Sequence, residues 1–169
     1  MGAEHALCPS GTARGPGGKA PRQQVRKTLT MSVIVNDAGF CSDDWRGGFV
    51  ELRDLVNRPW GVAPGLDLHC AADPAPVVAH FPRIGLIRIR LPDFAARCGF
   101  ELAQRIRSLG YRRRLRAWGN VLAHQYTLVR RAGFDEVEIS AALALRQPEE
   151  HWRFLGNWRH DRFGSRTVS

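Results

Sequence analysis

The sequence contains no long hydrophobic run, and its longest uninterrupted apolar stretch extends only from Ala141 to Leu145. A helix that crosses a bilayer needs roughly 18 or more consecutive apolar residues, so no transmembrane helix is predicted. Residues 1–30 also lack the continuous apolar segment of a secretory signal peptide. We therefore expect a cytoplasmic protein that has no membrane partner.

Cysteine is scarce, because the chain has only Cys8, Cys41, Cys70 and Cys98, and none of them forms a CxxC motif. Such cysteines are expected to stay reduced in the cytoplasm, so neither a disulfide framework nor a zinc site is predicted. The sequence also lacks the signatures of dinucleotide, nucleotide, zinc-protease and serine-hydrolase sites. We expect no cofactor and no metal, the catalytic residues are unknown, and the sequence leaves open whether the protein is an enzyme.

Lysine disappears after the N-terminal stretch, since both lysines precede Met31 and the remaining chain uses only arginine. This change predicts a disordered basic tail or an over-long start for residues 1–30. The composition of the rest, with 44% hydrophobic and 24% charged residues over the whole chain, is typical of a globular protein. We predict one α/β domain over residues 31–158 and a loose C-terminal tail over 159–169.

Aliphatic runs alternate with helical patterns along this domain. One repeat of 23 residues is visible when Leu109-Gly110-Tyr111 is aligned with Ala132-Gly133-Phe134, where each glycine suits a helix C-cap. Strands that alternate with helices indicate parallel pairing through right-handed crossovers. A three-layer open sheet is favoured, with a partial barrel-like arc as the alternative. The predicted strands cover 31–35, 65–70, 85–91, 112–118 and 134–139, and the predicted helices occupy the segments between them, including 48–57, and the segments after 141.

Two of these strands carry arginine at alternate positions. Arg88 and Arg90 predict that residues 85–91 lie near a sheet edge or have one wetter face. The cluster at 112–116, together with Arg130-Arg131, could bind RNA phosphates. Because arginine replaces lysine throughout the domain, we favour a solvated face over a nucleic-acid partner.

Ligands of open parallel sheets bind at the carboxyl ends of the strands, where helix N-termini converge. Gly119 and Asn120 at a predicted helix start could hold an anion, with Arg97 as a bidentate partner and Gln125 close in sequence. The anion-binding candidates are therefore Arg97, Gly119, Asn120 and Gln125, and the further candidates at this edge are Asp93, Trp118, His124 and Ser140.

Each candidate also has a simpler interpretation. Asn120 is more often only a helix cap, Trp118 a packing residue, and a lone His124 a structural or surface residue. Asp67 and His69 share one face of a predicted strand, but two ligands do not complete a metal site.

The segment "RIRSLGYRRRLRAWGNVLAHQYTLVRRAGFDEVEIS" resembles the bacterial domain-of-unknown-function family 934. The resemblance extends over about 66–140 and has one ungapped register from Gly110 onward. The matching positions are Pro92, Phe94, Arg107, Gly110, Tyr111, Leu115, Arg116, Ala117, Gly119, Val121, Leu122, Gln125, Arg130, Gly133, Phe134 and Asp135.

The departures from the family pattern fall on polar positions. Ala96-Arg97-Cys98 replaces Asp-Gly-Arg, Asn120 replaces an Asp, His124 replaces an Asp, and Arg113-Arg114 replaces Gly-Glu. Members of the family look like cytosolic accessory proteins encoded beside enzymes of assimilatory sulfate and sulfite reduction. The resemblance therefore implies a non-catalytic accessory factor, with sulfite reductase or a related enzyme as partner. The alternatives are an enzyme that acts on a small anionic substrate at the strand ends and a basic RNA-binding protein.

Overall fold

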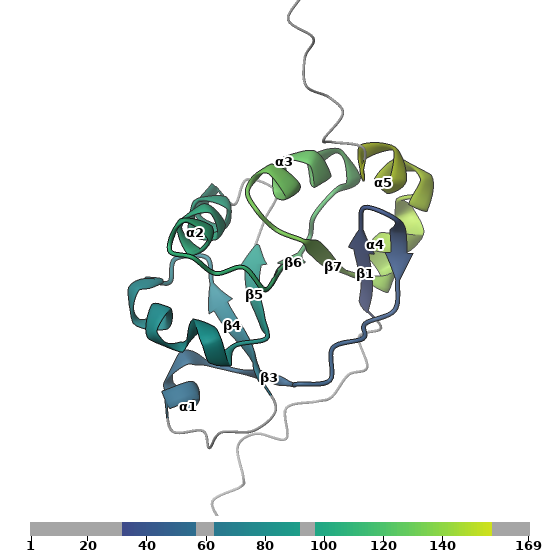
Figure 1. Cartoon of the computed structure of the whole chain (residues 1–169). Coiled ribbons are helices and arrows are strands. Elements are labelled where there is room, and N and C mark those ends of the chain that lie inside the picture. Colours follow the sequence, from purple (N-terminus) through teal and green to yellow (C-terminus); the bar gives the residue numbers. More distant parts are fainter. Residues whose placement is uncertain (1–31, 57–62, 92–96, 157–169) are drawn as a thin grey trace, which may run out of the picture.

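The computed structural model describes residues 32–56, 63–91 and 97–156. These residues form an open seven-stranded sheet in the order β2-β1-β7-β6-β5-β4-β3, in which neighbouring strands from β3 to β7 are parallel (Figure 1). The predicted α/β class with a mainly parallel sheet is confirmed. The strands are β1 (Ser32–Asn36), β2 (Gly39–Cys41), β3 (Phe49–Val50), β4 (Gly65–His69), β5 (Leu86–Leu91), β6 (Arg114–Gly119) and β7 (Glu136–Ser140).

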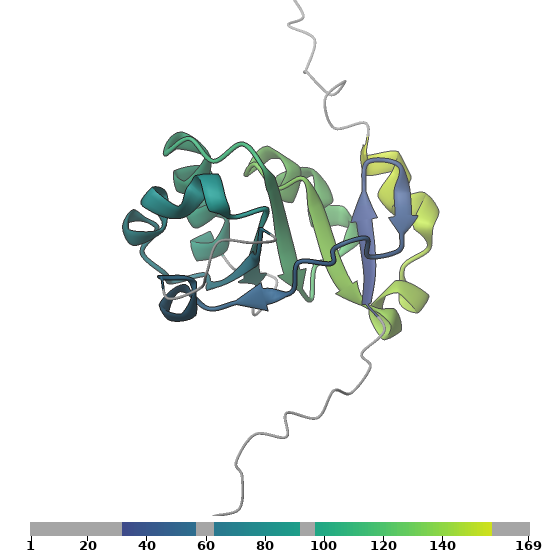
Figure 2. The same ribbon diagram turned by 60° about the horizontal axis from the view of Figure 1, so that its bottom comes forward.

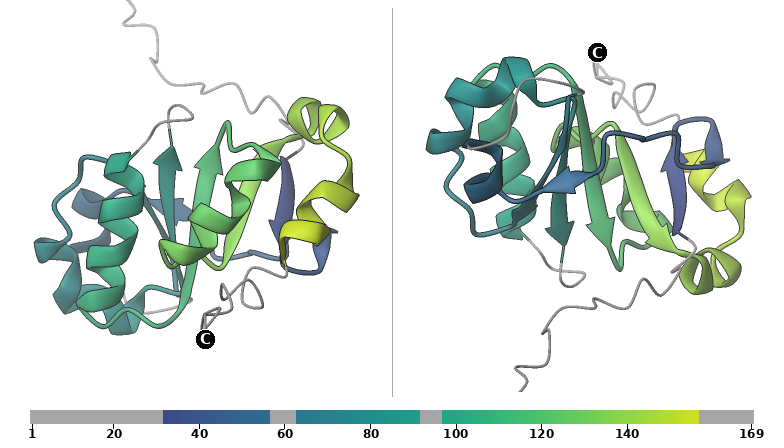
Figure 3. Two further views of the ribbon diagram at one scale, coloured as in Figure 1. Left: turned by 90° about the horizontal axis from the view of Figure 1, so that it is seen from above. Right: turned by 90° about the horizontal axis from the view of Figure 1, so that it is seen from below.

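The helices lie on one face of this sheet. Because β3 to β7 are neighbours in chain order, right-handed crossovers place every connecting helix on the same side. Figure 3 shows α2, α3 and α5 in front of the sheet from one side, and strands without a helical layer from the other. The predicted open sheet is therefore present, with one helical layer among the described residues in place of helices on both faces. The helical segments are α1 (Leu52–Val56), η1 (Ala75–Arg83), α2 (Arg97–Ser108), η2 (Ala123–Gln125), α3 (Tyr126–Arg131), α4 (Ala141–Arg146) and α5 (Glu149–Gly156).

No helix in the described ranges is long and apolar enough to cross a membrane. The predicted tails at 1–30 and 159–169 lie outside the described residues, as does residue 31.

Alternate strand residues form the hydrophobic core beneath the helices. Leu115 and Ala117 of β6, Val137 and Ile139 of β7, and Ile89 of β5 are fully buried. Successive side chains of a strand point to opposite faces, so the residues between them must lie on the side away from the helices. In β5, β6 and β7 those residues are mostly charged, which gives this sheet one apolar face and one polar face.

The 23-residue repeat corresponds to two strand-helix units. Gly110 and Gly133 follow α2 and α3 with φ angles of +102° and +104°, a left-handed conformation that glycine adopts without steric cost. Tyr111 and Phe134 come next and are buried. Arg107 joins the two units, because its guanidinium donates to the Gly133 carbonyl at 2.8 Å and to the Tyr111 carbonyl at 3.0 Å.

The first predicted strand exists as β1, but it pairs antiparallel with β7 and turns back into β2, a hairpin that the sequence pattern did not predict. Asn36 starts the turn, where its side-chain oxygen accepts a hydrogen bond from the Ala38 N–H at 2.8 Å. Helix α5 covers the hairpin with the buried ring of Trp152, whose centroid lies 6.4 Å from that of Phe40 and 5.7 Å from that of Tyr126.

Three local predictions need correction. The segment predicted as a helix over 48–57 is divided between the short strand β3 and the five-residue helix α1. Strand β5 lies between β4 and β6, so the wetter-face interpretation of its arginines holds and the edge interpretation does not. Asn120 does not cap the following helix, because η2 begins at Ala123 and the preceding Leu122 N–H donates to the Gln125 side chain at 3.0 Å.

Candidate functional site

The polar face of the sheet carries a network of ion pairs between neighbouring strands. Arg88 of β5 donates to both carboxylate oxygens of Asp67 in β4, at 2.6 and 2.8 Å, and to Glu138 in β7 at 3.1 Å. Arg116 of β6 donates to Glu136 at 2.7 Å and to Glu138 at 3.0 Å. Arg116 is completely buried, so the prediction of a solvated face is wrong for this arginine.

Residues 42–48 lie against this network, and Figure 2 shows this segment crossing the strands between β2 and β3. Asp43 accepts two hydrogen bonds from Arg116, at 2.8 and 3.0 Å, and Asp44 accepts one from Arg114 at 2.8 Å. The Trp45 indole N–H donates to the Gly48 carbonyl at 3.0 Å. The segment is therefore attached to the polar face by two neighbouring carboxylates.

These contacts shift the acidity of both aspartates. Burial alone would raise the pKa of Asp43, but hydrogen bonds from the Arg116 guanidinium and from the backbone N–H of Trp45 hold that pKa below its usual value. The hydrogen bond from Arg114 is the main reason that the pKa of Asp44 is also lowered. Both carboxylates therefore remain charged at neutral pH and hold residues 42–48 in place.

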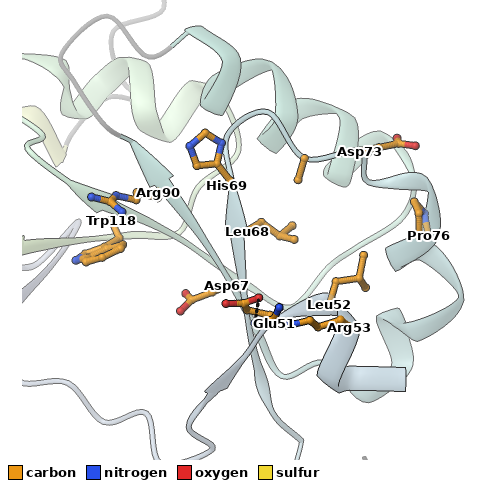
Figure 4. A pocket seen from close by; sticks show the side chains of 11 residues that line it. Glu51, Leu52, Arg53, Asp67, Leu68, His69, Asp73, Pro76, Arg90 and Trp118 are labelled. Carbon is orange, nitrogen blue, oxygen red and sulfur yellow. Dashed lines mark ion pairs between the residues drawn. The ribbon is translucent and has the colours of Figure 1, made fainter. Parts of the chain in front are cut away.

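A cleft of about 660 Å³ opens beside the network, at the carboxyl ends of the parallel strands (Figure 4). The sheet register explains its polar lining, because His69 pairs with Arg90 and Arg90 pairs with Trp118 across β4, β5 and β6. All three residues line the cleft. This is the edge at which the topology of an open parallel sheet predicts a ligand.

Arg90 is one of two exposed arginines that line this cleft, together with Arg53. Its guanidinium carbon lies 5.2 Å from the centroid of the Trp118 ring, which favours a stacked position over the indole. The acidic residues nearby are already paired: Asp67 with Arg88 and Glu51 with Arg53 at 3.0 Å. Within the described ranges, no carboxylate forms an ion pair with Arg90. Its guanidinium can therefore bind a ligand anion without first breaking a described ion pair.

His69 offers a second donor in the cleft. The Ala71 backbone N–H donates to His69 Nδ1 at 3.3 Å, so this nitrogen must act as an acceptor. A neutral imidazole with Nδ1 as acceptor carries its proton on Nε2. His69 can thus donate one hydrogen bond from Nε2.

Asp67 and His69 both line the cleft, as expected for alternate residues of one strand. In the part of the chain that the structure describes, no three residues of His, Cys, Asp or Glu are grouped so as to hold a metal ion.

Among the residues predicted at this edge that the structure describes, only Trp118 lines the cleft. Arg97 begins α2 with its side chain 89% exposed and lies 3.9 Å from Glu101. Gly119 has a φ angle of +144° and packs against the Leu91 carbonyl, where a Cβ atom would clash. Asn120 is exposed, and the Gln125 side-chain oxygen is used by the Leu122 N–H. The structure does not gather the four anion-binding candidates into one site.

The remaining candidates lie elsewhere or outside the described residues. His124 lines a separate hollow of about 310 Å³ beside Gln147. Ser140 caps α4, because its Oγ accepts a hydrogen bond from the Leu143 N–H at 3.2 Å. Asp93 falls within a range that the structure does not describe.

Sequence reasoning did not place Arg90 among the candidate site residues, although the alternation of Arg88 and Arg90 indicated a polar face. The parallel register between β5 and β6 could have identified Arg90, because it places this residue beside Trp118, which was already a candidate. No sequence signal connected Asp43 with Arg116.

A family model described as "Bacterial protein of unknown function (DUF934)" matches residues 65–161. The matched range contains β4 to β7 with His69, Arg90 and Trp118, whereas β1, β2 and residues 42–48 precede it. No curated protein and no solved structure was found to match the chain. Because the family model spans more than half of the chain, the protein belongs to the bacterial DUF934 family.

Proposed function

We propose that the protein binds a small anion in the cleft at the carboxyl ends of β4 to β6. We further propose that it acts in the cytoplasm as a non-catalytic accessory factor linked to assimilatory sulfate or sulfite reduction. The observation that carries the anion-binding proposal is Arg90, an exposed guanidinium that lines this cleft beside Trp118 and has no acidic partner among the described residues.

Several features support this choice of ligand. A guanidinium presents parallel N–H groups that match the oxygens of a sulfate, phosphate or carboxylate group. Stacking on Trp118 restricts the orientation of Arg90, so less conformational freedom is lost when an anion binds. The Nε2–H of His69 supplies another donor on the same edge of the sheet.

The non-catalytic part of the proposal is supported by the state of the acids in the cleft. A general base needs a free carboxylate or an imidazole that a carboxylate orients. Asp67 is bound by Arg88 through both oxygens, and Glu51 is bound by Arg53. The contact to His69 Nδ1 comes from a backbone amide and a cysteine sulfur, not from a carboxylate.

The link to sulfur assimilation, and sulfite reductase as a partner, come from the family resemblance alone. RNA binding receives less support, because Arg114 and Arg116 pair with acidic residues of the chain and do not face solvent freely.

A thermal-shift screen with sulfite, sulfate and phosphate, followed by titration calorimetry, tests the anion site. We expect at least one oxyanion to stabilise the protein, and Arg90→Gln to weaken its binding by about tenfold or more, as for the loss of a charged hydrogen bond. Arg97→Gln and Arg131→Gln, two changes at exposed arginines outside the cleft, serve as controls and should leave the affinity unchanged. Equal binding by Arg90→Gln and the wild type would refute the proposed site.

A second experiment tests the accessory role. Co-purification of the wild-type protein with sulfite reductase, without turnover of any bound anion by the isolated protein, would support it. Conversion of the bound anion by the protein alone, lost in Arg90→Gln, would instead favour the alternative of an enzyme for a small anionic substrate.

A further inference from the structure

We infer that the preferred ligand of this cleft is an organic monoanion with an apolar body, such as a carboxylate or a sulfonate, which binds more tightly than an inorganic oxyanion or a polyphosphate. This inference rests on the proposed anion-binding function and specifies the class of ligand that the same site accepts.

The size of the cleft is the first reason. Its volume of about 660 Å³ lies within the range of roughly 300–1,000 Å³ that is usual for sites of small organic molecules. An inorganic sulfate or phosphate ion has only a central atom and four oxygens, so one ion at Arg90 would leave most of this volume to water. A ligand with a carbon body would fill it.

The lining of the cleft is the second reason. The apolar part of the wall is formed by Leu52 of α1, Leu68 of β4, and Ala72 and Pro76 around the start of η1. Figure 4 shows Leu52 and Leu68 on the side of the cleft away from Arg90. These apolar side chains come from three different parts of the chain and converge on one space. An inorganic ion gains nothing from such walls, whereas each buried methylene of an organic ligand gains affinity.

The charges around the cleft limit the charge of the ligand. Three acidic residues, Glu51, Asp67 and Asp73, also line the cleft. Each lies close to an arginine, but their side chains are 63%, 37% and 64% exposed. Two exposed arginines also line the cleft, but Arg53 pairs with Glu51 at 3.0 Å, whereas Arg90 forms no ion pair with any described acidic residue. A ligand with one negative group near Arg90 keeps its body away from these carboxylates, whereas a polyphosphate would bring further charges close to them.

The division of the cleft into a cationic end and an apolar end predicts a distinctive dependence on ligand length. We expect affinity to rise about threefold to fourfold for each methylene from acetate through butanoate to hexanoate. Hexanesulfonate should bind about as tightly as hexanoate, because both present one anionic group on an apolar chain. Sulfate, phosphate and pyrophosphate should bind at least tenfold more weakly than hexanoate.

Titration calorimetry on the full chain, with the carboxylate series, hexanesulfonate and the inorganic ions, tests the inference. Leu52→Asn should flatten the dependence on chain length while the affinity for acetate is kept, and Arg90→Gln should weaken all carboxylates. Pro76→Ser, at an exposed position of the same wall, provides a second variant if Leu52→Asn does not fold. Leu128→Asn, at an exposed leucine of α3 that does not line the cleft, is the matched control.

The possible outcomes separate the two proposals. If sulfate or phosphate binds as tightly as hexanoate, and through Arg90, the ligand class is wrong but the anion site stands. A length dependence that survives both wall variants would also overturn the ligand class. If no anion binds in a way that depends on Arg90, both proposals fail.

Discussion

Replacing Arg116 by methionine should cause a large loss of stability without exposing the hydrophobic core. The methionine keeps an unbranched apolar stem, but it removes the guanidinium that donates to Asp43, Glu136 and Glu138. Arg116 is fully buried, and the side chains of the two glutamates are only 9% and 8% exposed. The substitution therefore leaves carboxylates that water barely reaches.

Removal of one partner from a buried ion pair costs about 3–5 kcal/mol, chiefly because the remaining charge is uncompensated. Arg88 still pairs with Glu138, and Arg114 still pairs with Glu136, so we expect a value near the lower limit. For a domain of this size, about 3 kcal/mol corresponds to a decrease in Tm of roughly 6–12 °C.

Urea unfolding at pH 7, followed by tryptophan fluorescence, measures the change in the free energy of unfolding. Arg113→Met is the matched control, because Arg113 is exposed in the same arginine cluster and its loss should change stability by less than about 0.5 kcal/mol. Adding Glu138→Gln to Arg116→Met should restore part of the loss, since it removes one uncompensated charge. A loss below about 1 kcal/mol for Arg116→Met, or an equal loss for Arg113→Met, would show that the buried network does not stabilise the fold.

Three further changes have expected outcomes. Asp43→Asn should lower the free energy of unfolding by about 2 kcal/mol at pH 7. Because the folded-state pKa of Asp43 is lowered, its contribution to stability is present above the unfolded pKa of about 3.9 and is lost as pH falls through the folded pKa. Urea titrations of the wild type and the variant should therefore converge in that acidic range. Gly119→Ala should lower stability by more than about 1 kcal/mol, because its φ of +144° is strained for alanine and the new methyl group meets the Leu91 carbonyl; an unchanged Tm would contradict this. Ser140→Ala should lower stability by about 1 kcal/mol through loss of the α4 cap, with ligand affinity in calorimetry unaffected, and a weaker affinity would place Ser140 in the site after all.

Much of the architecture could be predicted because it depends on local patterns. The segments 85–91 and 134–139 were both predicted as strands, and Gly110 and Gly133 marked the ends of α2 and α3. The hairpin of β1 and β2 was missed because β2 has only three residues and its pairing depends on tertiary packing under α5.

The burial of Arg116 could not be predicted because its partners are distant in sequence. Glu136 is 20 positions away, and Asp43 is 73 positions away, so a cluster of arginines is read as a solvated surface when only its neighbours are considered. The same limit applies to the ligand-binding edge. The topology pointed to the end of the sheet where the cleft opens, but the side chains that meet there are set by the register between β4, β5 and β6.

The departures from the family pattern at Arg97, Asn120 and His124 lie on side chains that do not line the cleft. The two acids that the family has at positions 120 and 124 are therefore lost from outside the proposed anion site.

Arg88 and Arg90 occupy alternate positions of one strand, yet they have opposite consequences for a ligand. Arg88 sequesters the carboxylates of Asp67 and Glu138 and lies between the rings of Phe49 and Trp118. Without Arg88, the Asp67 carboxylate would be free to form an ion pair with Arg90, which lies on the same face of the sheet, and this pair would compete with a bound anion. Arg88, which does not line the cleft, would thus influence the affinity of the cleft for an anion. Ligand binding would therefore constrain both arginines.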